Sequence, residues 1–261
     1  MKQFLFSVPK VTFITITYNA ETHLQESIGS LKNQAFTDYE YIIIDGASTY
    51  ATIDIIKQNQ NFISRWISEP DEGISDAMNK GLALASGEWI FFLHADDYLL
   101  SPESLEKVYP YLQEDCDILS FRLYYEENQK IIETKPPRWD WTVLFKTGLY
   151  HQAVFCRKQL FERIGRFDKG LKIAMDYDFF LRAYLAKSKV MLCPEFISVM
   201  RKTGISSRLD WPSLKHRFAE EQKIHYHYAN GLFMRLIYSV YWALYLPYRR
   251  GKYCLNILGS K

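Results

Sequence analysis

The sequence is poor in the features that mark several classes of protein. It has only 12 glycines and 9 prolines in 261 residues, which excludes collagen-like and low-complexity chains. Apolar residues make up 48% of the chain, so intrinsic disorder is excluded as well. A net charge of +2 gives no general indication of nucleic-acid binding. A chain of this length can bury a sizeable core, and we expect one substantial domain with at most a small appendage.

Cysteine is also scarce, and no leader segment is evident. The chain has four cysteines, Cys116, Cys156, Cys193 and Cys254, with neither a CxxC pair nor zinc-site spacing. They are typical of free thiols in a reducing compartment. The first ten residues lack both the apolar run and the small-residue cleavage site of a signal peptide. We therefore expect a cytoplasmic protein.

The C-terminal segment lacks an uncharged run long enough to cross a membrane. Its longest such run before Pro247 is Leu236–Leu246, well short of the ~20 apolar residues that a spanning helix needs. Residues 201–261 nevertheless carry 11 basic and 3 acidic side chains, against 21 and 27 in residues 1–200. Aromatic residues flanked by arginine and lysine over 232–252 are typical of a helix on a membrane surface. A helix packed on the domain or in a dimer explains the pattern equally well.

The first half of the chain alternates between patterns of buried strands and of amphipathic helices. Strands are predicted at 11–17, 39–46, 62–69 and 88–93. Helices are predicted between them and from Ser101 onward, with Gly87 as the C′ residue of a helix over 72–86. This order implies right-handed crossovers and an α/β fold with a mainly parallel central sheet flanked by helices. Neither GxGxxG after the first strand nor a Walker A sequence occurs, which excludes the dinucleotide-binding Rossmann and P-loop motifs.

Carboxylates follow three of the four predicted strands. Asp45 ends the second strand, Asp71 follows the third, and Asp96 and Asp97 follow the fourth. The carboxyl ends of parallel strands meet at one edge of a sheet, where ligands bind in such folds. One acid alone is as often a helix cap, but three together favour a site for a metal or for ribose hydroxyls. Asp96 and Asp97 offer the oxygen ligands that Mg²⁺ or Mn²⁺ prefers.

Five motifs in register carry a resemblance to a known family. They are Thr17-Tyr18-Asn19, Ile44-Asp45-Gly46-Ala47-Ser48, the segment 69–81, Gly87-Glu88-Trp89-Ile90 and Leu93-His94-Ala95-Asp96-Asp97. With these motifs the chain resembles an inverting family 2 glycosyltransferase with a GT-A fold, of the type that builds bacterial O-antigen, capsule or exopolysaccharide. The resemblance is strong over residues 10–100 and moderate over 148–206. It implies a nucleotide diphospho-sugar donor, by default a UDP-sugar, a glycan or polyprenyl-linked acceptor, and a divalent metal, Mn²⁺ or Mg²⁺.

The resemblance assigns the nucleotide-sugar site to the strand ends. The matching residues are Thr17, Tyr18, Asn19, Asp45, Asp71, Lys80, His94, Ala95 and Asp96. Asp96 matches the metal ligand of the family's DxD motif, and His94 replaces the first acid of that motif. A neutral histidine at that position can still hydrogen-bond ribose or ligate a transition metal.

The resemblance places the reaction itself in the second half of the chain. Asp176 matches the catalytic base, because inversion needs a carboxylate to take the proton of the acceptor hydroxyl. The other matching residues are His151, Gln152 and Asp178 in the pocket for acceptor or donor sugar, and Arg201, Lys202 and Ser206 in a loop over the diphosphate. From the residues alone, Asp176 and Asp178 are better explained as acids at the positive end of a helix. His151 is equally well explained as a structural histidine.

We expect a GT-A domain over 1–210, with the nucleotide-sugar half in 1–100 and the acceptor half in 101–210. A helical, aromatic and basic extension then covers 211–261, and could hold the protein at the inner face of the cytoplasmic membrane. Two other functions stay open. A sugar nucleotidyltransferase normally has a glycine-rich loop near its N-terminus, and residues 1–25 contain no glycine. A non-catalytic sugar-nucleotide- or glycan-binding protein with a decayed site gains some weight from His94.

Overall fold

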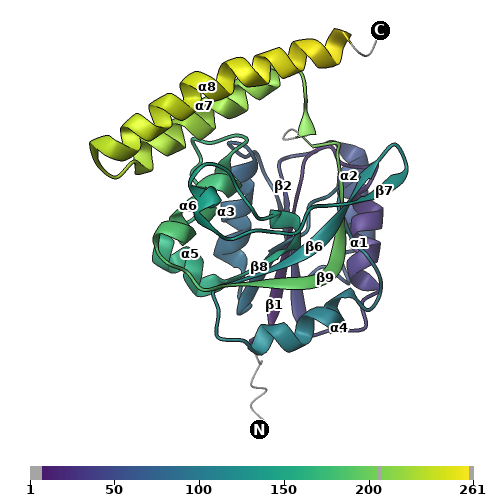
Figure 1. Cartoon of the computed structure of the whole chain (residues 1–261). Coiled ribbons are helices and arrows are strands. Elements are labelled where there is room, and N and C mark those ends of the chain that lie inside the picture. The colour runs from purple at the N-terminus through teal and green to yellow at the C-terminus, as the bar shows by residue number, and fades with distance from the viewer. Residues whose placement is uncertain (1–7, 205–206, 259–261) are drawn as a thin grey trace. The chain divides into compact units, whose positions relative to one another are not determined.

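The computed structural model describes residues 8–204 and 207–258. The chain forms two compact units, Met1–Thr203 and Gly204–Lys261, and each is described by itself. The first unit is a central sheet between two layers of helices (Figure 1). The described part of the second unit consists of two helices. The sequence places this boundary after residue 210, and the existence of a domain ending there stays a prediction.

The N-terminal half of the sheet is parallel and positions the strand ends. Its strands are β1 (Val11–Thr17), β2 (Tyr39–Asp45), β3 (Arg65–Ser68) and β4 (Trp89–Phe92), in the order β3-β2-β1-β4. The helices between them are α1 (Leu24–Lys32), α2 (Tyr50–Gln58) and α3 (Ile74–Leu84). Thr17 pairs with Asp45, and Asp45 with Ser68, so these three residues lie side by side at one edge of the sheet. The four predicted strands are confirmed, apart from one to three residues at their ends.

Glycine allows two close approaches around β1. A Cβ atom added to Gly81 of α3 would collide with the Ile14 side chain, so this helix packs tightly on the strand. A Cβ atom on Gly87 would lie 2.6 Å from the backbone nitrogen of Thr12. The expectation that Gly87 is a C′ residue is therefore wrong. Helix α3 already ends at Leu84, and Gly87 is needed because the chain there runs against β1.

The second half makes the sheet mixed. Its strands are β5 (Tyr98–Leu99), β6 (Ile118–Glu127), β7 (Lys130–Glu133), β8 (Val154–Arg157) and β9 (Val190–Arg201). Strand β8 is antiparallel to both β4 and β6, and β6 is parallel to β9. The helices are α4 (Ser104–Val108), α5 (Lys158–Ile164) and α6 (Met175–Leu185), with short 3-10 helices η1 (Tyr109–Gln113), η2 (Trp141–Leu144) and η3 (His151–Ala153). The predicted α/β fold is confirmed, but the sheet is parallel throughout only in its first half, and in the second half the parallel pair of β6 and β9 lies beside antiparallel strands.

One helix begins later than the sequence predicts. Helix α4 starts at Ser104 and not just after Ser101, because the intervening residues form a turn. In that turn the Ser101 N–H donates to the Ser104 side chain over 3.0 Å.

Helices α3, α5 and α6 cover one face of the sheet, and α1, α2 and α4 cover the other (Figure 1). The strand ends are therefore held between two helical layers.

Aromatic side chains join the two halves of the sheet inside the core. The rings of Phe13 on β1, Phe91 on β4 and Phe155 on β8 are all fully buried. Phe91 lies 4.5 Å from Phe155 and 5.4 Å from Phe13, measured between ring centroids. Such pairs stabilise the fold beyond the area that they bury. They fix β4, which carries the DxD-like segment, against β8, which follows His151.

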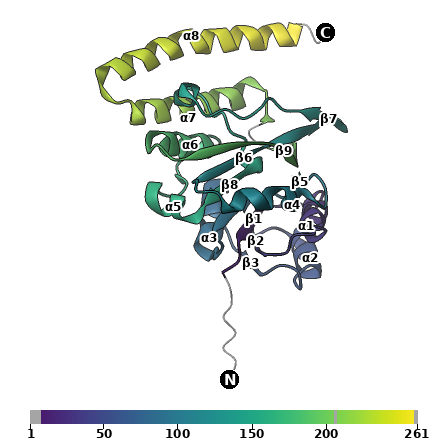
Figure 2. The same cartoon turned by 60° about the horizontal axis from the view of Figure 1, so that its bottom comes forward.

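The second unit is a helical hairpin of α7 (Trp211–Tyr228) and α8 (Gly231–Leu258), which Figure 2 shows from another side. The Asp210 side chain caps α7 by accepting from the Ser213 N–H at 2.9 Å. The helical character predicted for 211–261 is confirmed by α7 and α8 in the described part of that segment. No helix among the described residues is long and apolar enough to cross a membrane.

Aromatic contacts hold the two helices of this hairpin together. His225 of α7 is buried and stacks on Tyr238 of α8, with ring centroids 4.4 Å apart. The indole N–H of Trp242 donates to Nδ1 of His225 over 2.9 Å. Tyr238 and Trp242 are each only 2% exposed, so this face of α8 is covered by α7.

Candidate active site

Asp45 is the most deeply buried acid at the edge formed by the strand ends. It ends β2 with no exposed surface, and its Oδ2 accepts from the Ser48 N–H at 2.9 Å and from the Ser68 hydroxyl at 2.6 Å. Its Oδ1 is buried and has no hydrogen-bond partner among the described residues. A buried acceptor without a donor is unfavourable. A ligand N–H or O–H delivered to Oδ1 would remove that cost.

Tyr18 and Asp71 both lie close to Gly46, the residue that follows Asp45. A Cβ atom built on Gly46 would come within 3.4 Å of the Tyr18 ring and 2.5 Å of Asp71 Oδ2. The Tyr18 side chain is 67% exposed, so one face of its ring is open to a flat partner. Asp71 holds its own loop by accepting the Gly73 N–H at 2.8 Å with Oδ1. The residues predicted for the base and ribose are thus brought together.

Thr17 and Asn19 bracket Tyr18 at the end of β1. The Thr17 hydroxyl is buried and, within the described part of the chain, has no hydrogen-bond partner. Asn19 adopts a left-handed conformation with φ 48°, and its Oδ1 accepts from the Thr49 N–H at 3.0 Å. Its own N–H donates to the Ser48 hydroxyl over 2.8 Å. Asn19 therefore braces the β1 and β2 loops together, and its direct contact with a nucleotide stays a prediction.

Lys80 reaches from α3 to the loop that precedes Asp71. Its ammonium donates to the Pro70 carbonyl over 2.8 Å and pairs with Glu69 at 2.8 Å. Asp76, one turn earlier on the same helix, lies 3.6 Å from the ammonium. Lys80 is thus close to Asp71, as the sequence predicts, but it is already paired. Its contact with the donor stays a prediction.

Asp96 is the half-buried acid that follows β4. Its Oδ2 accepts from the Thr203 hydroxyl at 2.5 Å. The following residue, Asp97, is buried, and burial, together with the charge of Asp96, raises the pKa of Asp97 well above its usual value. Ala95 between His94 and Asp96 is buried as well. Asp96 is therefore the acid of this turn that solvent and a ligand reach most readily.

Arg201 holds this turn in place from the end of β9. Its backbone N–H donates to Asp97 Oδ1 at 3.1 Å, and its guanidinium donates to the Asp96 carbonyl at 2.9 Å. The same guanidinium pairs with Glu26 at 2.8 Å and with Glu126 at 3.1 Å. These contacts favour a structural part for Arg201. Its predicted contact with a diphosphate stays a prediction.

The rest of the predicted diphosphate loop is only partly described. The ammonium of Lys202 pairs with Glu127 at 2.9 Å and lies 5.0 Å from the centre of the Tyr125 ring. Ser206 lies outside the described residues. The structure therefore gives Lys202 partners on β6, and the closing of this loop over a donor stays a prediction.

His94, His151 and Asp176 form a continuous chain of polar contacts. Nε2 of His94 lies 2.6 Å from Nε2 of His151, and Nδ1 of His151 lies 3.5 Å from Oδ2 of Asp176. Burial, together with the charge of His151, lowers the pKa of His94 to about 3. His94 is therefore neutral near pH 7.

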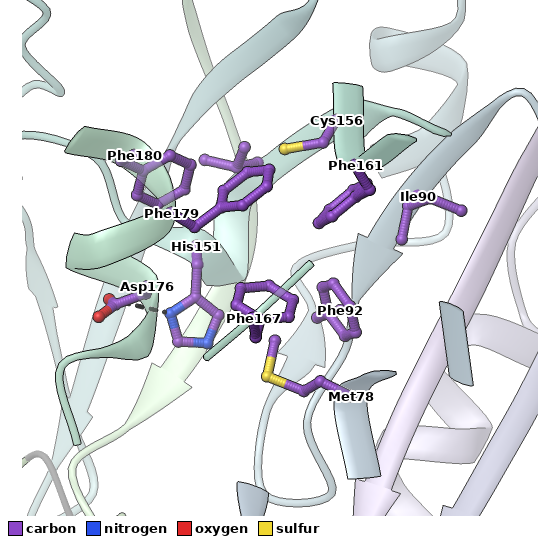
Figure 3. Close-up of a pocket in the computed structure, with 11 residues that line it drawn as sticks. Met78, Ile90, Phe92, His151, Cys156, Phe161, Phe167, Asp176, Phe179 and Phe180 are labelled. Atoms are coloured by element: carbon purple, nitrogen blue, oxygen red, sulfur yellow. Dashed lines mark ion pairs between the residues drawn. The ribbon is translucent and has the colours of Figure 1, made fainter. Parts of the chain in front are cut away.

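An apolar pocket opens beside this chain of contacts. His151 and Asp176 lie on its wall, and Figure 3 shows aromatic rings from β4, α5 and α6 around them. Among the lining residues are Phe92, Phe161 and Phe179. Such a surrounding excludes water and strengthens electrostatic contacts. The base predicted for the reaction thus lies at the edge of an apolar cavity.

The two other residues predicted for the sugar pocket are not among those that line this cavity. The carboxylate of Asp178 pairs with Arg182 at 2.9 Å, and the same guanidinium donates to the Gly165 carbonyl at 2.8 Å. Gln152 is buried, and its backbone carbonyl accepts from the Ser198 hydroxyl at 2.7 Å. The ion pair favours a structural part for Asp178. The sugar contacts predicted for Asp178 and Gln152 stay predictions.

The donor set at Asp96 suits a metal that arrives together with a phosphate. Within residues 8–204 and 207–258, no group of three or more His, Cys, Asp or Glu side chains is arranged to hold a metal ion. Mg²⁺ in nucleotide sites needs only one or two carboxylates, since waters and phosphates complete its shell. Asp96 fits that requirement. The Nε2 atom of His94 faces His151, so it does not offer that nitrogen to a metal.

Two hydroxyl groups at the site were not predicted from the sequence. That of Ser68 donates to Asp45, and that of Thr203 donates to Asp96. Ser68 could have been found, because it ends β3 opposite Asp45 in the parallel register. Thr203 could not, because its contact with Asp96 spans 107 residues.

The chain matches known glycosyltransferases over most of its length. Residues 12–202 match the family described as Glycosyl transferase family 2. A "PGL/p-HBAD biosynthesis glycosyltransferase" of Mycobacterium tuberculosis is 31% identical over 188 residues, which cover 68% of this chain and 71% of that protein. An uncharacterised glycosyltransferase of Methanocaldococcus jannaschii is 31% identical over 203 residues, covering 72% and 69% of the two chains.

Solved structures show the same fold at lower sequence identity. Staphylococcus aureus TarS (residues 1–349), in complex with UDP-GlcNAc, has a TM-score of 0.66 at 22% identity, covering 83% of this chain and 65% of that one. The mannosyltransferase PcManGT of Pyrobaculum calidifontis, in complex with GDP-Man and Mn²⁺, has a TM-score of 0.67 at 18% identity, covering 97% and 75%. Taken with the strand-edge acids, these matches show that the chain belongs to glycosyl transferase family 2 and is a glycosyltransferase of the GT-A fold.

Proposed function

We propose that this glycosyltransferase moves a sugar, with inversion, from a nucleotide diphospho-sugar to a glycan or lipid-linked glycan in surface polysaccharide synthesis. The observation that carries the proposal is the unpartnered Oδ1 of buried Asp45 beside the open ring of Tyr18. A nucleobase can supply a partner for each of these groups, because its flat face can stack on the Tyr18 ring and its ring N–H can donate to Oδ1 of Asp45. The TarS and PcManGT complexes with nucleotide sugars support a donor of this class.

The chemistry of Asp45 favours some bases over others. At neutral pH, uracil, thymine and guanine each carry a ring N–H that can donate to a carboxylate oxygen, whereas the pairing edge of cytosine donates only through its exocyclic amino group. A buried acceptor that stays unpaired costs free energy, so the site favours a base whose ring N–H meets Oδ1 over one whose donor lies at a different position. We therefore favour UDP-sugars, with GDP- and dTDP-sugars next and CMP-sugars last.

In the reaction proposed here, sugar transfer takes place in one step with Asp176 as the base. An acceptor hydroxyl attacks the anomeric carbon while the bond from that carbon to the diphosphate oxygen breaks. The hydroxyl proton passes to the carboxylate of Asp176, and the nucleoside diphosphate leaves. The side chain of Asp176 is about a quarter exposed at the edge of the pocket, where an acceptor can reach it.

Asp96 completes the proposal on the donor side. It would hold Mn²⁺ or Mg²⁺ together with the diphosphate, as the Mn²⁺ complex of PcManGT suggests by analogy. When bound, such a metal neutralises the charge that grows on the leaving diphosphate. Thr203 keeps the Asp96 carboxylate in place by donating to Oδ2.

Calorimetry with nucleotides tests the donor site. Wild-type protein is expected to bind UDP more tightly than CMP, and Asp45→Asn to lose about tenfold or more in UDP affinity, because the amide N–H₂ would face the N–H of the base. Asp54→Asn, an exposed acid on α2, serves as the matched control and should bind like wild type. Equal UDP affinity in wild type and Asp45→Asn would contradict the donor-site assignment.

We also propose that α8 lies on an anionic membrane surface, where lipid-linked acceptors are found. A stripe of large apolar residues, here called the α8 stripe, repeats every four residues and is more than half exposed: Leu232, Leu236, Val240, Leu244 and Tyr248. Helical spacing places it opposite the face that packs on α7. Arg235, Arg250 and Lys252 add positive charge along α8, which complements anionic lipid at the inner face of the cytoplasmic membrane. Arg249 instead lies over the Phe218 ring of α7, 5.0 Å from its centre.

A further inference from the structure

The contacts of His151 indicate which of its two ring nitrogens carries a hydrogen. The two Nε2 atoms of His94 and His151 are 2.6 Å apart, so one hydrogen must lie between them. If His151 carried it while neutral, its Nδ1 would turn a lone pair toward the Asp176 carboxylate. If His94 carries it, Nδ1 of His151 has the hydrogen and donates toward Asp176. Only the second arrangement satisfies both contacts with two neutral rings.

In this arrangement His151 cannot act as the catalytic base. Its Nε2 lone pair accepts from His94, and its Nδ1–H faces Asp176, so neither nitrogen is free to take a proton from an acceptor hydroxyl. An aspartate that orients a histidine base would require the opposite, a histidine with one open nitrogen. In this chain the Asp176 carboxylate, about a quarter exposed at the pocket edge (Figure 3), keeps lone pairs that can take that proton.

We propose that His151 is a positioning residue for Asp176, and that His94 fixes the tautomer that lets it act; this rests on the proposed role of Asp176 as the base. Oδ1 of Asp176 accepts the Tyr177 N–H at 2.7 Å, and Oδ2 faces His151 at 3.5 Å. Donors on both oxygens fix the plane of the carboxylate. A distance of 3.5 Å is long for a hydrogen bond, and catalytic contacts of this kind commonly shorten when substrate binds.

The proposal also explains why a histidine can stand where the family has an acid. An ionised aspartate at position 94 could only accept a hydrogen bond. It would draw the hydrogen of neutral His151 to Nε2 and leave Nδ1 as a lone pair facing Asp176. A histidine at this position can donate instead, and the 2.6 Å contact places its Nε2 against that of His151.

Two isosteric substitutions separate the two nitrogens of His151. The amide nitrogen of His151→Asn falls near the place of Nδ1 and can still donate to Asp176, whereas that of His151→Gln falls near Nε2 and reaches His94 instead. We measure the release of UDP from UDP-GlcNAc and of GDP from GDP-mannose with water as acceptor. His151→Asn should keep kcat within about fivefold of wild type, and His151→Gln should lose about tenfold to hundredfold with donor KM unchanged.

The same pair in an Asp176→Asn background tests the coupling. The difference between His151→Asn and His151→Gln should vanish there, since the group that they position has lost its charge. In protein that retains the wild-type Asp176, equal kcat for His151→Asn and His151→Gln would overturn the positioning role, whether both variants are active or both are inactive. Full activity of Asp176→Asn alone would instead overturn the proposed base. UDP affinity within twofold of wild type shows that each variant is folded.

Discussion

At the residue scale, Asp96 is the carboxylate to which we assign the metal. Its side-chain oxygen accepts from Thr203 and its carbonyl from Arg201, and among the described residues it belongs to no group of three or more side chains that could hold a metal. A metal bound here must take its other ligands from water and diphosphate. Metal and nucleotide should therefore bind only together.

Calorimetry of UDP with and without Mn²⁺ tests this coupling. In wild type, removing the metal with EDTA should weaken UDP binding about tenfold or more, and Asp96→Asn should bind UDP weakly whether or not Mn²⁺ is present. Asp54→Asn, which changes an exposed acid on α2, is the control and should keep the response to metal. UDP affinity that is the same with Mn²⁺ and with EDTA in wild type would count against a metal at Asp96.

The site residues divide by whether their contacts are local in sequence. Asp45, Asp71 and Asp96 could be predicted because they end neighbouring strands, and the strand edge indeed brings Asp45 and Asp71 together. The contact of His94 with His151 could not, because 57 residues separate them. Arg201 was predicted to bind the diphosphate because it matches a loop of the family that this chain resembles. The sequence does not show that Glu26 and Glu126 already surround it.

At the element scale, Glu40 joins β2 to its neighbours. It is buried and accepts hydrogen bonds from the Thr12 hydroxyl and from the Ser86 and Gly87 N–H groups. Burial alone would raise the pKa of Glu40, but these hydrogen bonds outweigh it and leave the pKa below its usual value. A lowered pKa in the folded state means that this stabilisation is present above the pKa of the unfolded chain, near 4.5, and is lost as pH falls further.

Substitution of Glu40 should therefore have a pH-dependent cost. Glu40→Gln is expected to lower the free energy of unfolding by about 1–3 kcal/mol at pH 7, with a smaller difference from wild type at pH 4. Urea unfolding at the two pH values measures both. Glu106→Gln, an exposed acid on α4, should cost little at either pH. A difference that stays constant or grows on acidification would show that the Glu40 charge does not stabilise the fold.

The elements themselves were predicted well only where strand and helix alternate. Strands β1 to β4 are short, buried and separated by amphipathic helices, so their patterns are distinct. Strands β6 and β9 were not predicted, although they form a long parallel pair. The register between them shifts near Arg122, and β9 contains Pro194, which usually argues against a strand. Their pairing depends on tertiary context that periodicity does not contain.

At the scale of the whole molecule, the α8 stripe is expected to bind the protein to lipid membranes. Full-length protein is expected to sediment with vesicles of phosphatidylcholine and phosphatidylglycerol, but much less with phosphatidylcholine alone. Leu236→Glu with Leu244→Glu should abolish this binding, because it buries charge in the apolar interface. Ile131→Glu with Ile132→Glu, exposed on β7, is the matched control and should bind like wild type.

Two results would contradict a lipid partner for α8. One is wild-type protein that stays in solution with either vesicle. The other is a double-glutamate variant that loses self-association in light scattering but sediments with vesicles like wild type. The second would identify the α8 stripe as a contact between copies of the chain.

Turnover of a nucleotide sugar by wild type and by Asp176→Asn tests the central claim most directly. The change is isosteric and keeps the acceptor for the Tyr177 N–H, so the fold and donor site should persist. We predict that wild type cleaves UDP-GlcNAc or another nucleotide sugar. Asp176→Asn should be slower by about a hundredfold or more, with UDP affinity within twofold of wild type. Equal turnover of the two proteins, or UDP binding by wild type without cleavage of any donor, would contradict it.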